Sequence, residues 1–181
     1  MKELIQNYKL EPRTFLVFLI TLFPITLLIG SSVINSSIVL IDLLFLLILI
    51  KEKKINFLRN HSFYILMFIW AALILNMLLS INVENSISRS IGFIRFIIFI
   101  FAIKFILNKN KTDDRLIFFS WSIIFFIVTI DIIFESIFGF NTLGFQSYLP
   151  GRISSFLNDE LKIGNFYFGF ILLTLSFIYN S

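Results

Sequence analysis

Residues 116–138 read LIFFSWSIIFFIVTIDIIFESIF and contain only two charged side chains, Asp131 and Glu135. An α-helix that crosses a bilayer needs about 20 mostly apolar residues. This stretch meets that requirement, and neither glycine nor proline interrupts it. It therefore predicts one membrane-spanning helix that carries both acids near its C-terminal end.

The same pattern recurs on both sides of this stretch. Short polar segments separate the apolar runs and are predicted as turns, among them 82–88 and 31–37. Part of segment 31–37 can instead extend the helix that follows it. We expect an all-α, polytopic bundle of transmembrane helices that forms a single membrane domain over residues 1–181. The predicted spans are about 14–30, 34–50, 63–81, 87–107, 116–138 and 161–179, with an external loop at 139–160.

Composition supports a membrane protein and excludes several kinds of site. Hydrophobic residues make up 58% of the chain and charged residues 14%, against roughly 45–50% and about 25% in ordinary globular proteins. The chain has no cysteine and a single histidine, His61. Disulfides, thiolate metal sites and a histidine metal cluster are therefore excluded. We expect neither a metal nor a cofactor.

Basic residues gather on alternate connections between the predicted spans. Connections rich in Lys and Arg stay in the cytoplasm under the positive-inside rule. We therefore expect a cytoplasmic N-terminus and an external 139–160 loop. This placement explains the net charge of +4 without nucleic-acid binding. The basic residues on the predicted cytoplasmic side are Lys2, Lys9, Arg13, Lys51, Lys53, Lys54, Arg59, Lys104, Lys109, Lys111 and Arg115.

Ionisable side chains inside the predicted spans are few and lie toward the predicted outer surface. At 1.5 Å of rise per residue, Asp42, Arg95 and Asp131 lie roughly 6–12 Å below it. Such groups are costly in a bilayer and usually face the bundle interior or a water-filled cavity. Two interpretations stay open: an ion pair of Arg95 with Asp42 or Asp131 that fixes helix packing, or a site that opens to the outer leaflet.

Asp131 and Glu135 are i,i+4 neighbours on one helix face. Because like charges at this spacing repel, we expect either a cation between them or one protonated carboxyl group. Arg95 and Arg152 are the candidate cations. Arg89, at the outer mouth of span 87–107, is either an interfacial side chain or a contact for an anion.

The predicted external loop contains Gly151-Arg152 followed by Ser154 and Ser155. An arginine is a permanent cation with planar donors that suit phosphate oxygens. The two serines can donate further hydrogen bonds to the same group. A lipid-linked pyrophosphate is one ligand for such a loop. The alternative is that Arg152 anchors lipid headgroups or braces the loop.

Residues 131–170, DIIFESIFGFNTLGFQSYLPGRISSFLNDELKIGNFYFGF, carry a family resemblance. A span with an acid at its end, a G-F-N-x-x-G turn, and G-R-I-S-S-F before an acidic Asn158-Asp159-Glu160 cluster are similar to the O-antigen ligase-related family. That family includes O-antigen ligases and polymerases. The resemblance is closest over 131–170 and looser over the rest of the chain.

The resemblance implies a lipid-dependent membrane glycosyltransferase of the bacterial inner membrane. Such an enzyme transfers a glycan from undecaprenyl pyrophosphate to an acceptor at the periplasmic face, either the lipid A core or another lipid-linked glycan. It needs no metal. The implied pyrophosphate-binding residues are Arg152, Arg95 and Arg89, with Asp131, Glu135, Ser154, Ser155, Glu160 and Asp42 in support.

The chain also departs from that family. The family's later periplasmic loop, which carries a histidine, is absent, and His61 is predicted on the cytoplasmic side, out of reach of the acceptor. We assign no catalytic residue, interpret the chain as an N-terminal fragment, and expect it to be inactive alone. Ligase and polymerase remain equally open. The alternatives are a non-catalytic membrane accessory or scaffold protein and a transporter fragment.

Overall fold

The computed structural model describes residues 12–81, 83–107, 111–147, 151–157, 164, 166 and 167. Within these residues, all regular structure is helical, as predicted. The elements are α2 (Pro12–Ile29), α3 (Ser31–Lys51), η1 (Ile55–Leu58), α4 (His61–Leu78), α5 (Val83–Gly92), α6 (Ile94–Leu107), α7 (Lys111–Phe138) and η2 (Ser155–Leu157).

Five segments are long and apolar enough to cross a membrane. They are α2, α3, α4, the stretch Ser86–Leu107 that contains most of α5 and all of α6, and α7. These segments confirm the first five predicted spans to within a few residues. The sixth predicted span, 161–179, lies outside the described residues except for 164, 166 and 167.

Two segments predicted as turns are helical instead. Residues 31–37 belong to α3, and only Gly30, with a φ of +137°, separates α3 from α2. The serines of this segment are compatible with a helix because a hydroxyl can bond to the preceding turn, as Ser36 Oγ does to the Ser32 carbonyl oxygen at 3.0 Å. Residues 83–88 belong to α5. For 31–37, the structure shows the alternative in which the segment extends the following helix, whereas the prediction of a turn was wrong for 83–88.

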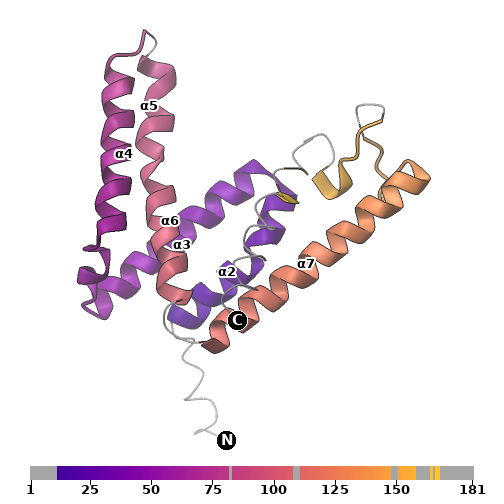
Figure 1. The fold of residues 1–181 in the computed structure, drawn as a ribbon, viewed down its shortest axis with the longest axis horizontal. Coiled ribbons are helices and arrows are strands. Elements are labelled where there is room, and N and C mark those ends of the chain that lie inside the picture. The colour runs from indigo at the N-terminus through magenta and orange to yellow at the C-terminus, as the bar shows by residue number, and fades with distance from the viewer. Residues whose placement is uncertain are drawn as a thin grey trace, which may run out of the picture. The chain divides into compact units, whose positions relative to one another are not determined.

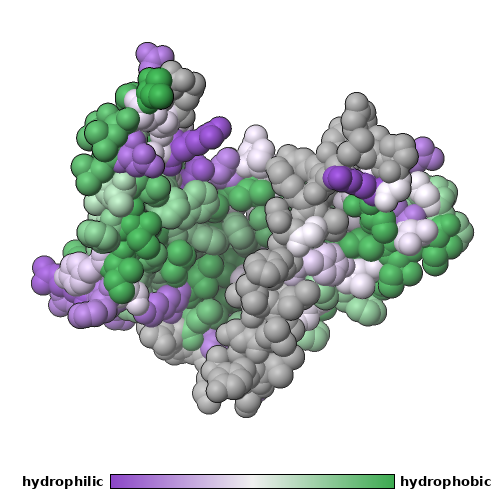
Figure 2. All heavy atoms as spheres, turned by 45° about the horizontal axis from the view of Figure 1, so that its top comes forward, coloured by the Kyte–Doolittle hydropathy of each residue, from purple (hydrophilic) through white to green (hydrophobic). Residues whose placement is uncertain are grey.

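Contacts divide the chain into two compact units, and the first comprises Met1–Val17 and Ile38–Asn110. In this unit α4 lies beside α5 and α6 (Figure 1). The Trp70 indole N–H donates to the Ser90 carbonyl oxygen at 3.0 Å and ties α4 to α5. In Figure 2, apolar side chains cover the middle of this unit, at the left of the view, and hydrophilic side chains gather toward its upper and lower ends. That distribution is the one that a bilayer requires of a helical protein.

The second unit comprises Phe18–Ser37 and Lys111–Ser181. The Trp121 indole N–H on α7 donates to the Ile20 carbonyl oxygen on α2 at 3.0 Å, which joins two segments far apart in the sequence. Asp113 and Asp114 lie in the first turn of α7, where negative charge is favourable against the helix dipole. The prediction of a single membrane domain stays a prediction.

Candidate functional site

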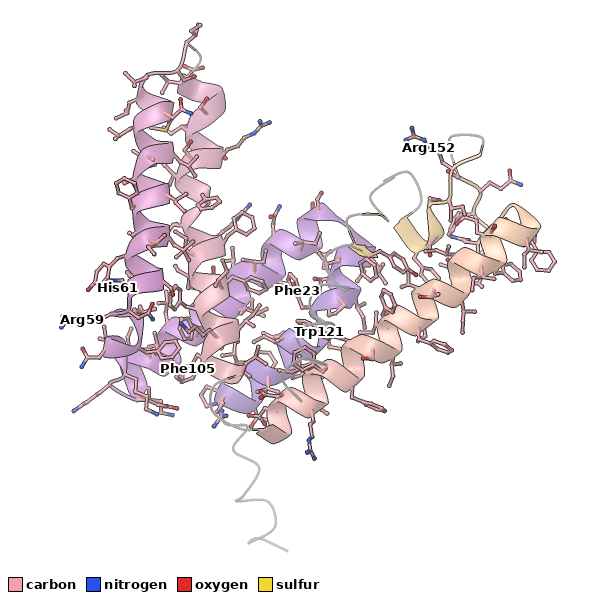
Figure 3. The ribbon with its side chains drawn as sticks, viewed as in Figure 1. Phe23, Arg59, His61, Phe105, Trp121 and Arg152 are labelled. Atoms are coloured by element: carbon pink, nitrogen blue, oxygen red, sulfur yellow. The ribbon has the colours of Figure 1, made fainter. Side chains whose placement is uncertain are left out.

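Asp131 and Glu135 lie one turn apart near the C-terminal end of α7, and both are buried. Their exposed fractions are 1% and 4%. A buried carboxylate is costly unless donors replace the hydrogen bonds it had with water. The donors come from the segment that follows α7, residues 139–157. At this site, the loop that follows α7 therefore folds back onto the C-terminal end of that helix (Figure 3).

Glu135 receives hydrogen bonds from two consecutive backbone amides. Its Oε1 accepts from the Ser154 N–H at 3.1 Å, and its Oε2 accepts from the Ser155 N–H at 2.5 Å. The Ser154 hydroxyl also donates to Oε1, at 3.4 Å. Hydrogen bonds to an ionised acceptor are the strong ones in proteins. Glu135 thus fixes the backbone of the loop immediately before η2.

Asp131 binds the loop at two places. Its Oδ1 accepts from the backbone N–H of Thr142 at 2.8 Å and from the Thr142 hydroxyl at 2.6 Å. Its Oδ2 accepts from the Ser155 hydroxyl at 2.6 Å. One carboxylate therefore joins the beginning of the loop to its end.

Asn141 organises the turn between these two attachments. Its side-chain oxygen accepts from the backbone N–H groups of Leu143 and Phe145 at 3.1 and 2.8 Å, and its amide nitrogen donates to the Ser155 carbonyl oxygen at 2.9 Å. Asn141 is 1% exposed. Gly144 adopts a φ of +84°, which a glycine reaches without steric cost. The side chain of Asn141 thus replaces backbone partners that the turn lacks.

Ser155 has a φ of +52°, which is unfavourable for a residue with a side chain. The left-handed conformation costs roughly 1–2 kcal/mol for such a residue. Its N–H, hydroxyl and carbonyl groups all make the hydrogen bonds described above, and these offset that cost. We name the set Asp131, Glu135, Asn141, Thr142, Ser154 and Ser155 the carboxylate anchor.

The donors to the two carboxylates correct one expectation from the sequence. Within the described part of the second unit, backbone amides and hydroxyl groups bind Asp131 and Glu135, and no cation of that unit does. Arg152 does not lie between them. Each of the two carboxyl groups has its own set of donors, and the alternative of one protonated carboxyl group stays a prediction. Ser154 and Ser155 were predicted only as donors to a ligand. Both are buried, and they donate to the carboxyl groups of Glu135 and Asp131 instead.

Arg152 lies on the segment between Gly151 and η2, and its side chain is exposed. Gly151 has a φ of +78°, so the chain reverses direction immediately before the arginine. In Figure 3 the guanidinium group of Arg152 projects outward from this segment. Arg152 is two residues before Ser154 in the sequence, and the backbone N–H of Ser154 donates a hydrogen bond to Glu135. The backbone next to Arg152 is thus bound to Glu135 through Ser154, while the Arg152 side chain is accessible.

The other predicted site residues belong to the first unit or are outside the described residues. Asp42 on α3 is 5% exposed, and Arg95 on α6 attracts it electrostatically. Nevertheless, Asp42 Oδ1 and Arg95 Nε have no hydrogen-bond partner among the described residues. Arg89 is exposed on α5, and Glu160 lies outside the described residues. Participation of Arg89 and Arg95 in one site with Arg152 stays a prediction.

The roles of Asn141 and Thr142 were not predicted from the sequence. The signal available was the order Gly139-Phe140-Asn141, because asparagine after a helix C-terminus commonly bonds to the backbone two residues further on. A second missed contact joins the Thr129 hydroxyl on α7 to the Tyr167 hydroxyl at 2.8 Å. Among the described residues, no group of acids and histidine is placed to hold a metal ion.

The described part of the chain is all-helical, and five of its segments are long and apolar enough to cross a membrane, as in a polytopic α-helical membrane protein. No protein-family model, no curated protein and no solved structure matches it.

Proposed function

We propose that this chain binds a polyprenyl pyrophosphate through Arg152 and supplies the donor-binding part of a membrane glycosyltransferase of the O-antigen ligase or polymerase type. Its donor would be a glycan linked to undecaprenyl pyrophosphate, at the periplasmic face of a bacterial inner membrane. Its acceptor would be the lipid A core or another lipid-linked glycan.

The observation that carries the proposal is that, among the described residues, neither acid of the carboxylate anchor pairs with Arg152. The two neighbouring acids are satisfied by serine, threonine and backbone donors. They therefore do not neutralise the arginine by pairing with it. A guanidinium group that keeps its charge and its donors can bind two oxygens of a phosphate at once.

The position of Arg152 also supports the proposal. The loop follows a helix that is long and apolar enough to cross a membrane, so Arg152 lies beyond the end of a span rather than within it. A pyrophosphate at the end of a polyprenyl chain has the same placement, because its hydrocarbon stays in the bilayer. Loop residues held by a rigid scaffold are common carriers of binding function.

In the proposed reaction, an acceptor hydroxyl oxygen bonds to the anomeric carbon of the sugar and gives up its proton to solvent. The bond between that carbon and the pyrophosphate breaks, and negative charge develops on the departing pyrophosphate oxygen. A preorganised cation at that oxygen stabilises the transition state more than the ground state. The anchor contributes by fixing the backbone near Arg152, so that less ordering is needed when the donor binds. This is a role in binding and charge stabilisation.

A binding measurement with the purified full chain in phosphatidylcholine nanodiscs tests the proposal. The probe is geranylgeranyl pyrophosphate, with geranylgeraniol as the uncharged comparison. We expect Arg152→Gln to weaken binding of the pyrophosphate by about tenfold or more, since hydrogen bonds between charged groups contribute about 1.5–3 kcal/mol. Binding of geranylgeraniol should not change.

Arg115→Gln is the matched control, because Arg115 is an exposed arginine near the beginning of α7, and the loop with Arg152 follows the other end of that helix. It should bind the pyrophosphate as the unaltered chain does. Equal affinity of Arg152→Gln and the unaltered chain would overturn the proposal. So would equal losses in the two arginine variants, because that result would indicate only a general effect of charge.

A further inference from the structure

The N-terminal part of α4 has two different faces in the first unit. On the inner face, the Phe57 ring of η1 lies 5.3 Å from the Phe105 ring and 6.4 Å from the Phe101 ring, both in edge-on arrangements. Phe63 lies 5.4 Å from Phe101. Aromatic pairs of this kind each contribute about 0.5–1.5 kcal/mol beyond their buried area. They hold η1 and the beginning of α4 firmly against α6.

The outer face of the same helix turns carries a hollow of about 320 Å³ lined by His61, Tyr64, Ile65 and Phe68. These residues recur at i, i+3, i+4 and i+7, so they form one stripe about 10 Å long along the helix. Phe68 is 76% exposed and Ile65 is 59% exposed. The stripe is apolar along its length and polar at the His61 end.

Cations gather beside the polar end of this stripe. Lys51, Lys53 and Arg59 are exposed on the connection that leads to α4. Lys54 is paired with Glu52 at 2.5 Å, so the acid of this connection is already neutralised. In Figure 3, Arg59 and His61 project from the same side at the beginning of α4. Positive charge therefore borders the apolar hollow at one end.

We propose that this face of α4 binds an anionic phospholipid, with its phosphate at Arg59 and His61 and an acyl chain along Tyr64, Ile65 and Phe68. The charge distribution selects this occupant. An apolar helix of another protein would cover the stripe without using the cations, whereas a lipid with a negatively charged headgroup uses both. The inner aromatic contacts position the cations in advance. This inference is independent of the proposed function.

Native mass spectrometry of the purified chain, released from detergent with equal amounts of phosphatidylglycerol and phosphatidylcholine of identical acyl chains, tests the site. We expect retained phosphatidylglycerol to exceed phosphatidylcholine. Arg59→Gln should lower that ratio about fivefold, since one cation near an anionic lipid contributes about 1 kcal/mol. Arg59→Lys should keep the ratio. Phe68→Ala should reduce retention of both lipids and leave their ratio unchanged.

Arg115→Gln removes an exposed arginine elsewhere in the chain and should leave the ratio unchanged. Equal retention of the two lipids by the unaltered chain would overturn the proposal. So would an Arg115→Gln effect as large as that of Arg59→Gln, because the preference would then belong to no particular site. A photoreactive group at position 68 should label lipid, and crosslinks to a second copy of the chain instead would also contradict the proposal.

Discussion

Two buried acids in this protein have opposite surroundings. Asp131 at the end of α7 accepts three hydrogen bonds from the loop that follows it. Asp42 in the middle of α3 is also buried, but its Oδ1 accepts no hydrogen bond from the described residues. Arg95 attracts Asp42 only through its charge. The first acid is integrated into local structure, and the second is not.

The difference shows how position along a span changes what a buried acid can do. Near a helix end, the following loop has unpaired backbone amides and hydroxyl groups that can turn back onto the carboxylate. In the middle of a span, backbone groups are already paired within their helices, so an acid must find a side-chain partner. Replacement of the acid should therefore lower stability strongly at Asp131 and Glu135 and only slightly at Asp42.

The largest effect is expected from Glu135→Ala. The substitution leaves the buried N–H groups of Ser154 and Ser155 without an acceptor, and each unsatisfied buried donor costs about 1–3 kcal/mol. We expect the loop to detach and amide hydrogen exchange at Ser154 and Ser155 to accelerate on the order of 100-fold. Exchange measured by mass spectrometry on the loop peptides checks this.

Ser136→Ala is the control for that experiment, because Ser136 is the exposed neighbour of Glu135 on the same turn. It should leave exchange in the loop unchanged. If Glu135→Ala also left exchange unchanged, the hydrogen bonds from the loop to Glu135 would not hold the loop in place, and the contrast with Asp42 would fail.

An intermediate effect is expected from Asn141→Ala. Two backbone N–H groups lose their acceptor, but the turn is close to the surface and water can reach part of it. We expect roughly tenfold faster exchange at Leu143 and Phe145, which corresponds to a loss of about 1.4 kcal/mol. Gln146→Ala, an exposed change in the same loop, should have no effect. A loss at Asn141 larger than that at Glu135 would reverse the order predicted here.

The sequence predicted the helices well because apolar length alone determines them in a membrane protein. It placed the end of the 116–138 helix correctly at residue 138. It did not predict that the helix begins at Lys111, because charged residues at a helix start do not follow the apolar pattern but are favoured there by the helix dipole. Similarly, it began the second span at residue 34, whereas α3 begins at Ser31.

The candidate site was predicted in part. Sequence spacing brought Asp131 and Glu135 to one helix face, and the loop motif identified Arg152, Ser154 and Ser155. The pairing of acids with serines was not predictable, because it depends on loop dihedrals such as the left-handed Ser155. From the sequence, the expectation was a cation between the acids, Arg95 or Arg152, or one protonated carboxyl group. The loop instead supplies uncharged donors from residues that only its fold brings close.

The smallest effect is expected from Asp42→Asn. This change removes a negative charge and leaves no donor unsatisfied at Oδ1, because Oδ1 accepts no bond among the described residues. It does remove the attraction to Arg95, but it also removes the desolvation cost of a buried charge, and the two terms act in opposite directions. We expect the free energy of unfolding, measured by titration with sodium dodecyl sulfate in mixed micelles, to change by less than about 1 kcal/mol.

Asp131→Asn in the same assay should be the more costly change, because the Asn nitrogen cannot accept the bonds that the carboxylate accepts. Equal losses for the two variants would mean that burial of the charge, rather than the supply of donors, distinguishes acids in this protein.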